Sequence, residues 1–157
     1  MTVRPYRPSD LPEITELFYD TVHTVNAGDY TPEQLDAWAD GAPDTAEWGR
    51  TLAEHTAFVA MEGEILAGFG DMDASGYLDR LYVHKDFQRR GIASALCGAL
   101  EATVGTERIV THASITARPF FESRGYRLVR ERRVVRHGVP MTNYRMEKRR
   151  PGPAQNA

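Results

Sequence analysis

Runs of apolar residues, rich in β-branched and aromatic types, recur along the chain and predict its strands. Seven such runs occupy residues 2–7, 56–61, 65–72, 77–83, 108–113, 126–135 and 139–147. The second and third runs flank Glu62-Gly63-Glu64, and the last two flank His137-Gly138, so each pair is predicted to form a hairpin. The run at 77–83 extends the first hairpin into a three-stranded meander.

Apolar residues at helical spacing predict the helices between these strands. Asp10 and Glu13 form a capping-box pattern ahead of an amphipathic helix that extends to about Val25. Thr31 is the predicted cap of a second helix, and a third, short helical piece begins at Asp44. Two further helices are predicted at residues 92–104 and 117–124.

The predicted order of elements is β-α-α-β-β-β-α-β-α-β-β, which indicates an α/β fold with a mixed sheet flanked by helices. At 157 residues, the chain is long enough for one domain with a substantial core. Residues 1–150 are expected to form this single domain, since no linker or internal repeat divides them. Residues 151–157 are expected to be a disordered polar tail.

The strand at 77–83 turns through Gly91 into an alanine-rich helix that begins at Ile92. The N–H groups of a first helical turn have no internal acceptors, and the helix dipole favours negative charge there. Arg89 and Arg90 add cationic donors suited to phosphate oxygens. Neither G-x-x-x-x-G-K-[ST] nor G-x-G-x-x-G is present, so a nucleoside-triphosphate loop and a dinucleotide fold are both poor matches.

The segment Gln88-Arg89-Arg90-Gly91-Ile92-Ala93 resembles the Q/R-x-x-G-x-G/A signature of the GNAT acyl-CoA N-acetyltransferases. In that superfamily this loop binds the pyrophosphate of coenzyme A. The predicted order of elements is also that of the GNAT fold, so the resemblance extends over about residues 3–148. It implies a GNAT-type mixed, mostly antiparallel twisted sheet.

A second segment, from Ser114 to Tyr126, resembles the N-x-x-A-x-x-F-Y-E-x-x-G-F pattern of the same superfamily. That segment is implied to lie beside the pantetheine and thiol of the cofactor. Ser114 stands where asparagine is common, and Tyr126 replaces a phenylalanine. The four matching residues are Ala117, Phe120, Glu122 and Gly125. Phe121 departs from the pattern, since many members carry a tyrosine there that can protonate the leaving thiolate.

The chemistry implied by the resemblance requires a neutral amine and a donor to the thioester oxygen. The backbone of Leu81, Tyr82 and Val83 is implied to pair with pantetheine like an added strand and to supply that N–H. Asp79, on the same strand, is the predicted base for the amine. A salt bridge from Asp79 to Arg80 or another basic residue is the alternative interpretation of this carboxylate.

The thiolate also needs a proton or some other stabilisation, and phenylalanine at position 121 cannot donate one. Tyr144, on the last predicted strand, is the predicted acid, and Tyr82 is a further candidate. Each tyrosine is alternatively a packed aromatic residue with a hydrogen-bonded hydroxyl.

The amine acceptor is expected to bind the helical region that precedes residue 56, namely residues 26–30 and the helices that carry Trp38 and Trp48. This region is acidic, which suits a cationic amine, although a solvated helical surface over buried tryptophans is the alternative. Its acidic residues are Asp20, Asp29, Asp36, Asp40, Asp44 and Glu47.

Charge is distributed unevenly along the chain. Residues 1–117 carry 8 basic and 19 acidic residues, a net −11, whereas residues 118–157 carry 11 and 3, a net +8. Five arginines alternate with valines in the last hairpin, as is typical of an exposed strand face: Arg127, Arg130, Arg132, Arg133 and Arg136. This basic end leaves nucleic-acid binding as a less favoured alternative function.

Other features limit the function and the location. No apolar run approaches the ~20 residues of a membrane span, so no membrane contact is predicted. The N-terminus lacks a signal-peptide core, and the single cysteine, Cys97, is expected to be a packed core thiol; both favour a cytoplasmic location. No third ligand is spaced near His23 or His112, so no metal site is predicted.

Through the resemblance, the sequence predicts an acyl-CoA-dependent N-acetyltransferase with acetyl-CoA as co-substrate. The acetyl group is expected to pass to a primary amine by direct attack in a ternary complex. The amine belongs to a small molecule or a peptide, and the protein is expected to be a monomer or a homodimer. A non-catalytic acyl-CoA-binding module is the alternative that Phe121 keeps open.

Overall fold

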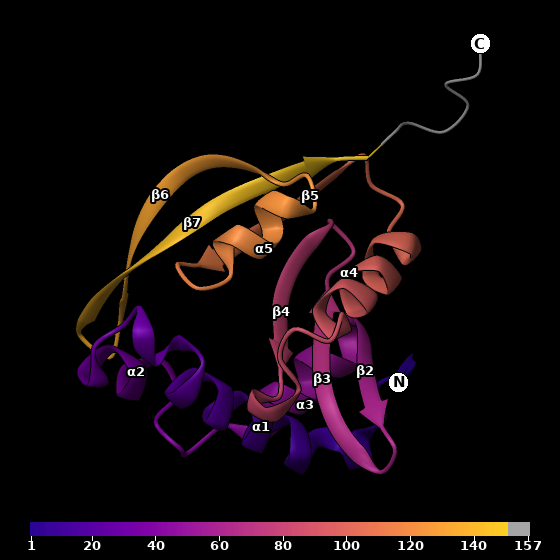
Figure 1. Cartoon of the computed structure of the whole chain (residues 1–157), viewed down its shortest axis with the longest axis horizontal. Helices are drawn as coiled ribbons and strands as arrows, with labels where there is room; N and C mark the ends of the chain where they lie inside the picture. The colour runs from indigo at the N-terminus through magenta and orange to yellow at the C-terminus, as the bar shows by residue number, and fades with distance from the viewer. Residues whose placement is uncertain (151–157) are drawn as a thin grey trace.

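The computed structural model describes residues 1–150 as a twisted sheet with helices on both faces (Figure 1). The order of strands in the sheet is β1-β2-β3-β4-β5-β7-β6. The strands are β1 (Thr2–Pro5), β2 (Thr56–Glu62), β3 (Ile65–Met72), β4 (Tyr77–Val83), β5 (Arg108–Ser114), β6 (Arg127–Arg136) and β7 (Val139–Arg149). Among these residues, neighbouring strands are antiparallel except for β4 and β5. The predicted mixed, mostly antiparallel sheet is confirmed, and the predicted tail lies outside the described residues.

Five α-helices connect these strands within residues 1–150: α1 (Leu11–Thr24), α2 (Pro32–Trp38), α3 (Thr45–Glu54), α4 (Ile92–Thr103) and α5 (Arg118–Ser123). Short 3-10 turns lie at Pro8–Asp10, Asn26–Gly28 and Lys85–Phe87. Three helices therefore precede β2, one more than in the predicted order, because the piece after Asp44 is a full helix. The Asp44 side chain accepts a hydrogen bond from the Glu47 N–H and caps this helix. None of these helices is long and apolar enough to cross a membrane.

One predicted helix cap is confirmed and one is wrong. Gln34 N donates to Thr31 Oγ1 at 3.2 Å, and Thr31 N donates to Gln34 Oε1 at 2.9 Å, which completes the box at the start of α2. Asp10 makes no such bond to α1. Its carboxylate instead accepts from the Arg4 guanidinium at 2.8 and 2.9 Å and from Arg7 N at 2.8 Å, because a charged partner holds it more strongly than a backbone N–H.

The helices form two layers, one on each face of the sheet. Val59 and Phe69 face α1 and α3, while Ala60 and Ala67 face α4. Helix α4 lies close to β3 because Gly68 has no side chain, and a Cβ there would meet Ile92 Cγ2 at 2.9 Å. This contact fixes the start of α4 next to the strands of the meander.

Strands β4 and β5 pair only where the beginning of β4 meets the middle of β5. The parallel register joins Tyr77 to Val110 and Leu78 to Thr111, and no pairing follows within the described residues. Figure 1 shows β4 and the β5–β7 part of the sheet diverging beyond this point. On its other edge, β4 stays paired with β3, apart from a bulge in which Asp79 is the extra residue between Leu78 and Arg80.

The β6–β7 hairpin turns at His137 and Gly138, which have φ angles of 48° and 77°. Two positive φ angles are the requirement of a type I′ turn, the turn that matches strand twist. The turn pairs Arg136 with Val139, and the register continues to Arg132 opposite Asn143. Since side chains alternate along a strand, this register decides which arginines of β6 face inward.

Cys97 lies fully buried in α4, as predicted for a core thiol. Burial and the nearby Glu101 carboxylate raise the pKa of its thiol to about 11. Glu101 in turn accepts hydrogen bonds from the Tyr126 hydroxyl at 2.7 Å and from Arg124 at 2.8 Å. A neutral thiol inside a satisfied network is a structural group and a poor nucleophile.

Candidate active site

Two cavities open where β4 and β5 part. The first, here called the loop cavity, has a volume of about 450 Å³ and lies beside residues 88–94 at the start of α4. The second, here called the hairpin cavity, has a volume of about 580 Å³ and lies beside the β6–β7 hairpin. They share the lining residues Leu81, Tyr82, Ser114, Ala117 and Phe121, so they meet across the gap between the strands.

The loop cavity contains an open helix N-terminus. Gly91 precedes α4 with a φ of 78°, a conformation that residues with a Cβ rarely adopt. Gly91, Ile92, Ala93 and Ser94 all line the cavity, and the N–H groups of a first helical turn have no acceptors within their own helix. Such a cluster of donors at the positive end of a helix dipole is suited to a phosphate.

The residues that precede Gly91 shape this loop in different ways. Arg89 lines the cavity and is held at a φ of 62°. The Arg90 guanidinium lies 4.9 Å from the centre of the Phe87 ring and does not line the cavity. Gln88 lines the cavity, but its Nε2 donates to the Val83 carbonyl at 2.8 Å and to the His84 carbonyl at 3.3 Å. Gln88 therefore fastens the loop to the end of β4.

The edge of β4 forms the boundary between the cavities. Leu81, Tyr82 and Val83 pair with β3 on one side, while their other edge borders the gap where β5 no longer pairs. Thr21 Oγ1 of α1 donates to the Val83 carbonyl at 3.1 Å and holds the end of the strand. An exposed backbone edge of this kind can receive an extended ligand as an additional strand.

Ser114 and Phe121 complete the wall opposite β4. Ser114 Oγ accepts a hydrogen bond from Ala117 N at 3.0 Å, which shapes the turn into α5. Phe121 is 3% exposed and packs edge-on against Tyr126, with ring centres 5.0 Å apart. Phe121 thus lines both cavities as an apolar surface without a proton to donate.

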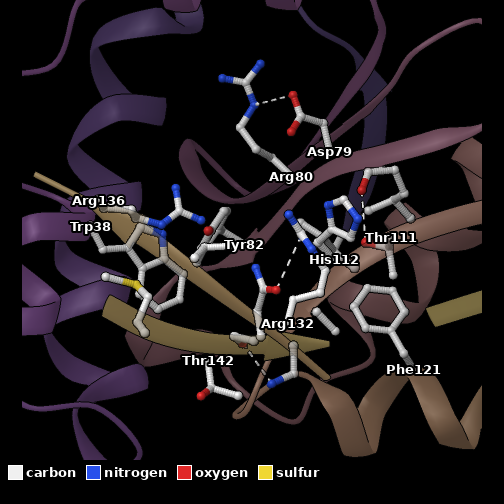
Figure 2. A pocket seen from close by; sticks show the side chains of 18 of the residues that line it. Trp38, Asp79, Arg80, Tyr82, Thr111, His112, Phe121, Arg132, Arg136 and Thr142 are labelled. Carbon is white, nitrogen blue, oxygen red and sulfur yellow. Dashed lines mark hydrogen bonds and ion pairs between the residues drawn. The ribbon is translucent and has the colours of Figure 1, made fainter. Parts of the chain in front are cut away.

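Asp79 lies in the hairpin cavity at the bulge of β4. Figure 2 shows it at one edge of the cavity together with Arg80, whose Nε lies 4.0 Å from the Asp79 carboxylate. Burial, with repulsion from the Asp71 carboxylate behind it, raises the pKa of Asp79 above its ordinary value. A carboxylate with a raised pKa that faces a cavity is well suited to accept a proton.

Arg80 belongs mainly to a structural network behind Asp79. Its guanidinium donates to the fully buried Asp71 carboxylate at 2.6 and 3.1 Å and to Thr51 Oγ1 at 2.8 Å. His55 Nδ1 lies 2.9 Å from the same carboxylate. Ligand atoms of His55, Asp71 and Asp79 lie within 4.8 Å of one another, but the Arg80 cation already compensates Asp71. The absence of a metal stays a prediction.

His112 of β5 also lines the hairpin cavity, a position that sequence reasoning considered only for metal binding. Its Nδ1 lies 3.1 Å from the Tyr77 hydroxyl. Burial, with the charges of Arg132, Arg145 and Arg130, lowers the pKa of His112 to about 4. The ring is therefore neutral at physiological pH and presents a hydrogen-bonding group to the cavity.

The charges around the hairpin cavity contradict the expected acidic acceptor pocket. Trp38, Trp48 and Tyr30 line it as expected. None of the six acidic residues named for this region does so, and three of them, Asp29, Asp40 and Asp44, lie in the connections between the helices. Arg132 and Arg136 of the basic hairpin line it instead. Arg132 is partly buried there, whereas Arg136 is exposed at the edge of the cavity. The remaining arginines of that group, Arg127, Arg130 and Arg133, are exposed as predicted.

The two candidate acids occupy different positions. Tyr82 lines both cavities, and burial raises the pKa of its hydroxyl to about 12, with smaller effects from surrounding charges. Tyr144 lines neither cavity. Its ring packs beside the Phe121 cluster, with the Arg118 guanidinium 4.6 Å from its centre. The structure does not bring Tyr144 together with Asp79.

A mixed sheet that parts beside a glycine turn and a helix N-terminus agrees with the acyl-CoA-dependent acyltransferase of the GNAT type that the sequence predicts. The family model of the acetyltransferase (GNAT) domain matches residues 26–148, which include the lining residues of both cavities except Phe18, Thr21 and Val25. The chain therefore belongs to the GNAT acetyltransferase family, and the predicted family and enzyme class are confirmed.

Similar proteins extend this match over nearly the whole chain. The uncharacterised N-acetyltransferase YafP of Escherichia coli (strain K12) is 35% identical over 92% of this chain and 93% of its own length. A GCN5-related N-acetyltransferase structure from Rhodopseudomonas palustris aligns with a TM-score of 0.91 and 30% identity, covering 94% of each chain. The PaiA N-acetyltransferase of Thermoplasma acidophilum, solved in complex with coenzyme A, shares the fold with a TM-score of 0.77 at 16% identity, covering 96% of this chain and all of that one.

Proposed function

We propose that this acetyltransferase transfers the acetyl group of acetyl-CoA directly to a primary amine while both substrates are bound. The observation that carries the proposal is the junction of the two cavities at Leu81, Tyr82 and Phe121. A thioester bound through the loop cavity and an amine bound in the hairpin cavity would meet there. Holding two reactants in this way can lower a barrier by ~7–11 kcal/mol, so a modest acid–base apparatus is sufficient.

In this proposal the loop cavity holds the donor. The first-turn N–H groups at Gly91, Ile92 and Ala93 bind the pyrophosphate. Arg89 adds positive charge within the cavity, and Arg90 adds it from beside the Phe87 ring. The free edge of β4 pairs with pantetheine and gives one N–H to the thioester oxygen. Gln88 acts by fixing the loop against β4, since its amide is already bonded to the Val83 carbonyl.

The hairpin cavity holds the amine, and Asp79 is its base. The ammonium form has no lone pair, so Asp79, directly or through water, accepts a proton before attack. The amine nitrogen then forms a bond to the acetyl carbonyl carbon and loses its second proton to solvent, and the C–S bond breaks as the intermediate collapses. The raised pKa of Asp79 supports this role because it brings the carboxylate closer to the pKa of the proton donor.

The thiolate of coenzyme A takes its proton from water in this scheme. Phe121 carries no ionisable hydrogen, and Tyr144 lies outside both cavities. Tyr82 is a poor proton donor, because the pKa of its hydroxyl is raised to about 12. Its ring also packs between Phe18 and Phe69. A free thiol of ordinary acidity is largely protonated near neutral pH, so solvent is an adequate donor.

The proposal is tested by screening thiol release from acetyl-CoA across small-molecule amines, peptide N-termini and lysine side chains. At least one class of amine is expected to release the thiol and to yield an N-acetyl product by mass spectrometry. Protection of the protein by acetyl-CoA against heating, with no release for any amine, would establish a non-catalytic acyl-CoA-binding module instead. We place the enzyme in the cytoplasm and leave monomer and homodimer to be resolved by light scattering.

A further inference from the structure

The hairpin cavity carries more positive than negative charge. Its charged lining residues are Asp79, Arg80, Arg132 and Arg136. The buried Asp71 carboxylate compensates the charge of Arg80, with Oδ2 of Asp71 2.6 Å from Nη2 of Arg80. Oδ2 of Asp79 lies 4.0 Å from Nε of the same guanidinium. Within residues 1–150, neither Arg132 nor Arg136 forms an ion pair. Two guanidinium groups therefore face this cavity without a carboxylate partner.

Arg132 occupies the inner of these two positions. It is partly buried, and its Nη1 makes a single long hydrogen bond of 3.4 Å to Asn143 Oδ1, which leaves most of its five donors free for a ligand. Figure 2 shows Arg132 near His112 in the middle of the cavity, with Arg136 beside Trp38 and Asp79 at the opposite edge. Both guanidinium charges also act on Tyr77, where they oppose the rise in its pKa that burial causes.

The phosphates of coenzyme A do not account for these arginines. The helix N-terminus suited to a phosphate, at Gly91 and Ile92, lines the loop cavity, and Arg132 and Arg136 do not. The two sites lie on opposite sides of the β4 edge, where Leu81 and Tyr82 separate them. An anion bound by the hairpin arginines would therefore belong to the other substrate.

We propose that the acceptor is a small amine that also carries an anionic group, and that Arg132 and Arg136 bind this anion. The inference rests on the proposed transfer to an amine and adds the class of acceptor. A guanidinium fork suits a carboxylate or a phosphate. The amine points to Asp79, and the aromatic rings of Trp38 and Tyr30 contact the apolar part of the molecule.

The test compares acceptors that differ only in the anionic group. The pairs are phenylalanine with phenethylamine, tryptophan with tryptamine, and O-phosphoethanolamine with ethanolamine. We expect the anionic member of at least one pair to be acetylated with a kcat/KM about tenfold or more above its partner, as for the loss of a charged hydrogen bond. The pairs that contain phenylalanine or tryptophan test a carboxylate, and the pair that contains O-phosphoethanolamine tests a phosphate.

Variants of the hairpin attribute any preference to these side chains. Arg132→Met and Arg136→Met should each raise the KM for the preferred anionic amine about tenfold and leave the KM for acetyl-CoA unchanged. Arg133→Met is the matched control, since Arg133 is exposed on the same strand and lines neither cavity. Arg132→Lys should restore part of the loss, because it keeps the charge but not the planar fork.

A binding measurement separates this inference from the proposed function. 3-Phenylpropionate carries the carboxylate without the amine, and its binding is followed by quenching of Trp38 and Trp48 fluorescence. Binding to the wild type that is lost in the Arg132→Met/Arg136→Met variant, with no acetyl transfer to any amine, would uphold the anion site and reject the proposed reaction. Transfer to amines with equal efficiency in every pair, and no effect of the arginine substitutions, would uphold the reaction and overturn the anion site.

Discussion

The loop cavity and the hairpin cavity share a wall but are built from different parts of the chain. One continuous segment, from the end of β4 to the start of α4, forms the side of the first that contains the helix N-terminus, and residues 21–26 and 114–121 form its other side. Side chains from helices α1–α3 and from strands β4–β7 form the second. A backbone site of this kind recognises a ligand common to many enzymes, whereas a side-chain site can change its ligand by substitution alone. The two cavities should therefore respond to mutation independently.

Asp79→Asn should have the largest effect, and only on the reaction of the amine. Removal of a general base typically slows the chemical step 10²–10⁴-fold, so kcat should fall on the order of a hundredfold or more. The wild-type rate should decline as the pH falls through the raised pKa of Asp79, because protonation removes the base, and the variant should lose this dependence. Stopped-flow thiol release over a range of pH measures both.

The dissociation constant of acetyl-CoA serves as the internal reference for this variant and should not change. Asp86→Asn is the matched control, because Asp86 has a 72% exposed side chain next to the loop and lines neither cavity. Wild-type turnover in Asp79→Asn would reject the carboxylate as the base.

Gly91→Val should have an intermediate effect, which is limited to the binding of acetyl-CoA. A Cβ at Gly91 would meet nothing within 4 Å, so the cost comes from the φ of 78°, about 1–2 kcal/mol for an L-residue. Relief of that strain would turn the first N–H groups of α4 away from the cavity. Calorimetry should show acetyl-CoA binding weakened about tenfold, with the KM of the amine unchanged.

Gly63→Val provides a close match for this substitution. Gly63 has a φ of 60° and also lacks neighbours within 4 Å of a Cβ, but it lies in the turn between β2 and β3. It should reproduce the loss of stability without the loss of affinity. Equal affinities in the two variants would show that the loop cavity does not depend on the backbone at Gly91.

Tyr144→Phe should have the smallest effect, with kcat, KM and the pH–rate profile all unaltered. Its hydroxyl lies at neither cavity, and its ring keeps the Arg118 contact as phenylalanine. Tyr30→Phe is a useful contrast, because the Tyr30 hydroxyl donates to the Thr142 carbonyl at 2.8 Å and accepts from Ile115 N at 2.9 Å. That variant should lose about 1–3 kcal/mol of stability. A change in the pH–rate profile of Tyr144→Phe would restore Tyr144 as the acid.

The sequence was most informative where structure is local. The glycine turn, the helix start and the meander of β2, β3 and β4 depend on neighbouring residues, so contiguous patterns predicted them. The same locality explains why contiguous residues, together with the family resemblance, predicted a phosphate site at residues 88–93, and this site stays a prediction.

The hairpin cavity could not be predicted in the same way. His112 and Arg132 come from separate strands, and their approach depends on sheet order and register. Consecutive residues of a strand point to opposite faces, and both Arg132 and Arg133 are basic. The alternation of residue types along β6 therefore does not identify which face points into the cavity. The acidic residues of the region that precedes β2 led to a wrong expectation, because charge composition does not record the direction in which a helix or loop presents its side chains.

The two-residue turn at His137 and Gly138 has a consequence for how this family can diversify. A single inserted or deleted residue there would shift β6 by one position against β7 and exchange its two faces. Arg132 and Arg136 would then point away from the cavity, and Arg133 would point into it. If Arg132 and Arg136 bind the acceptor as proposed, its preference would thus switch in one evolutionary event at a surface turn, while the loop cavity is inherited unchanged.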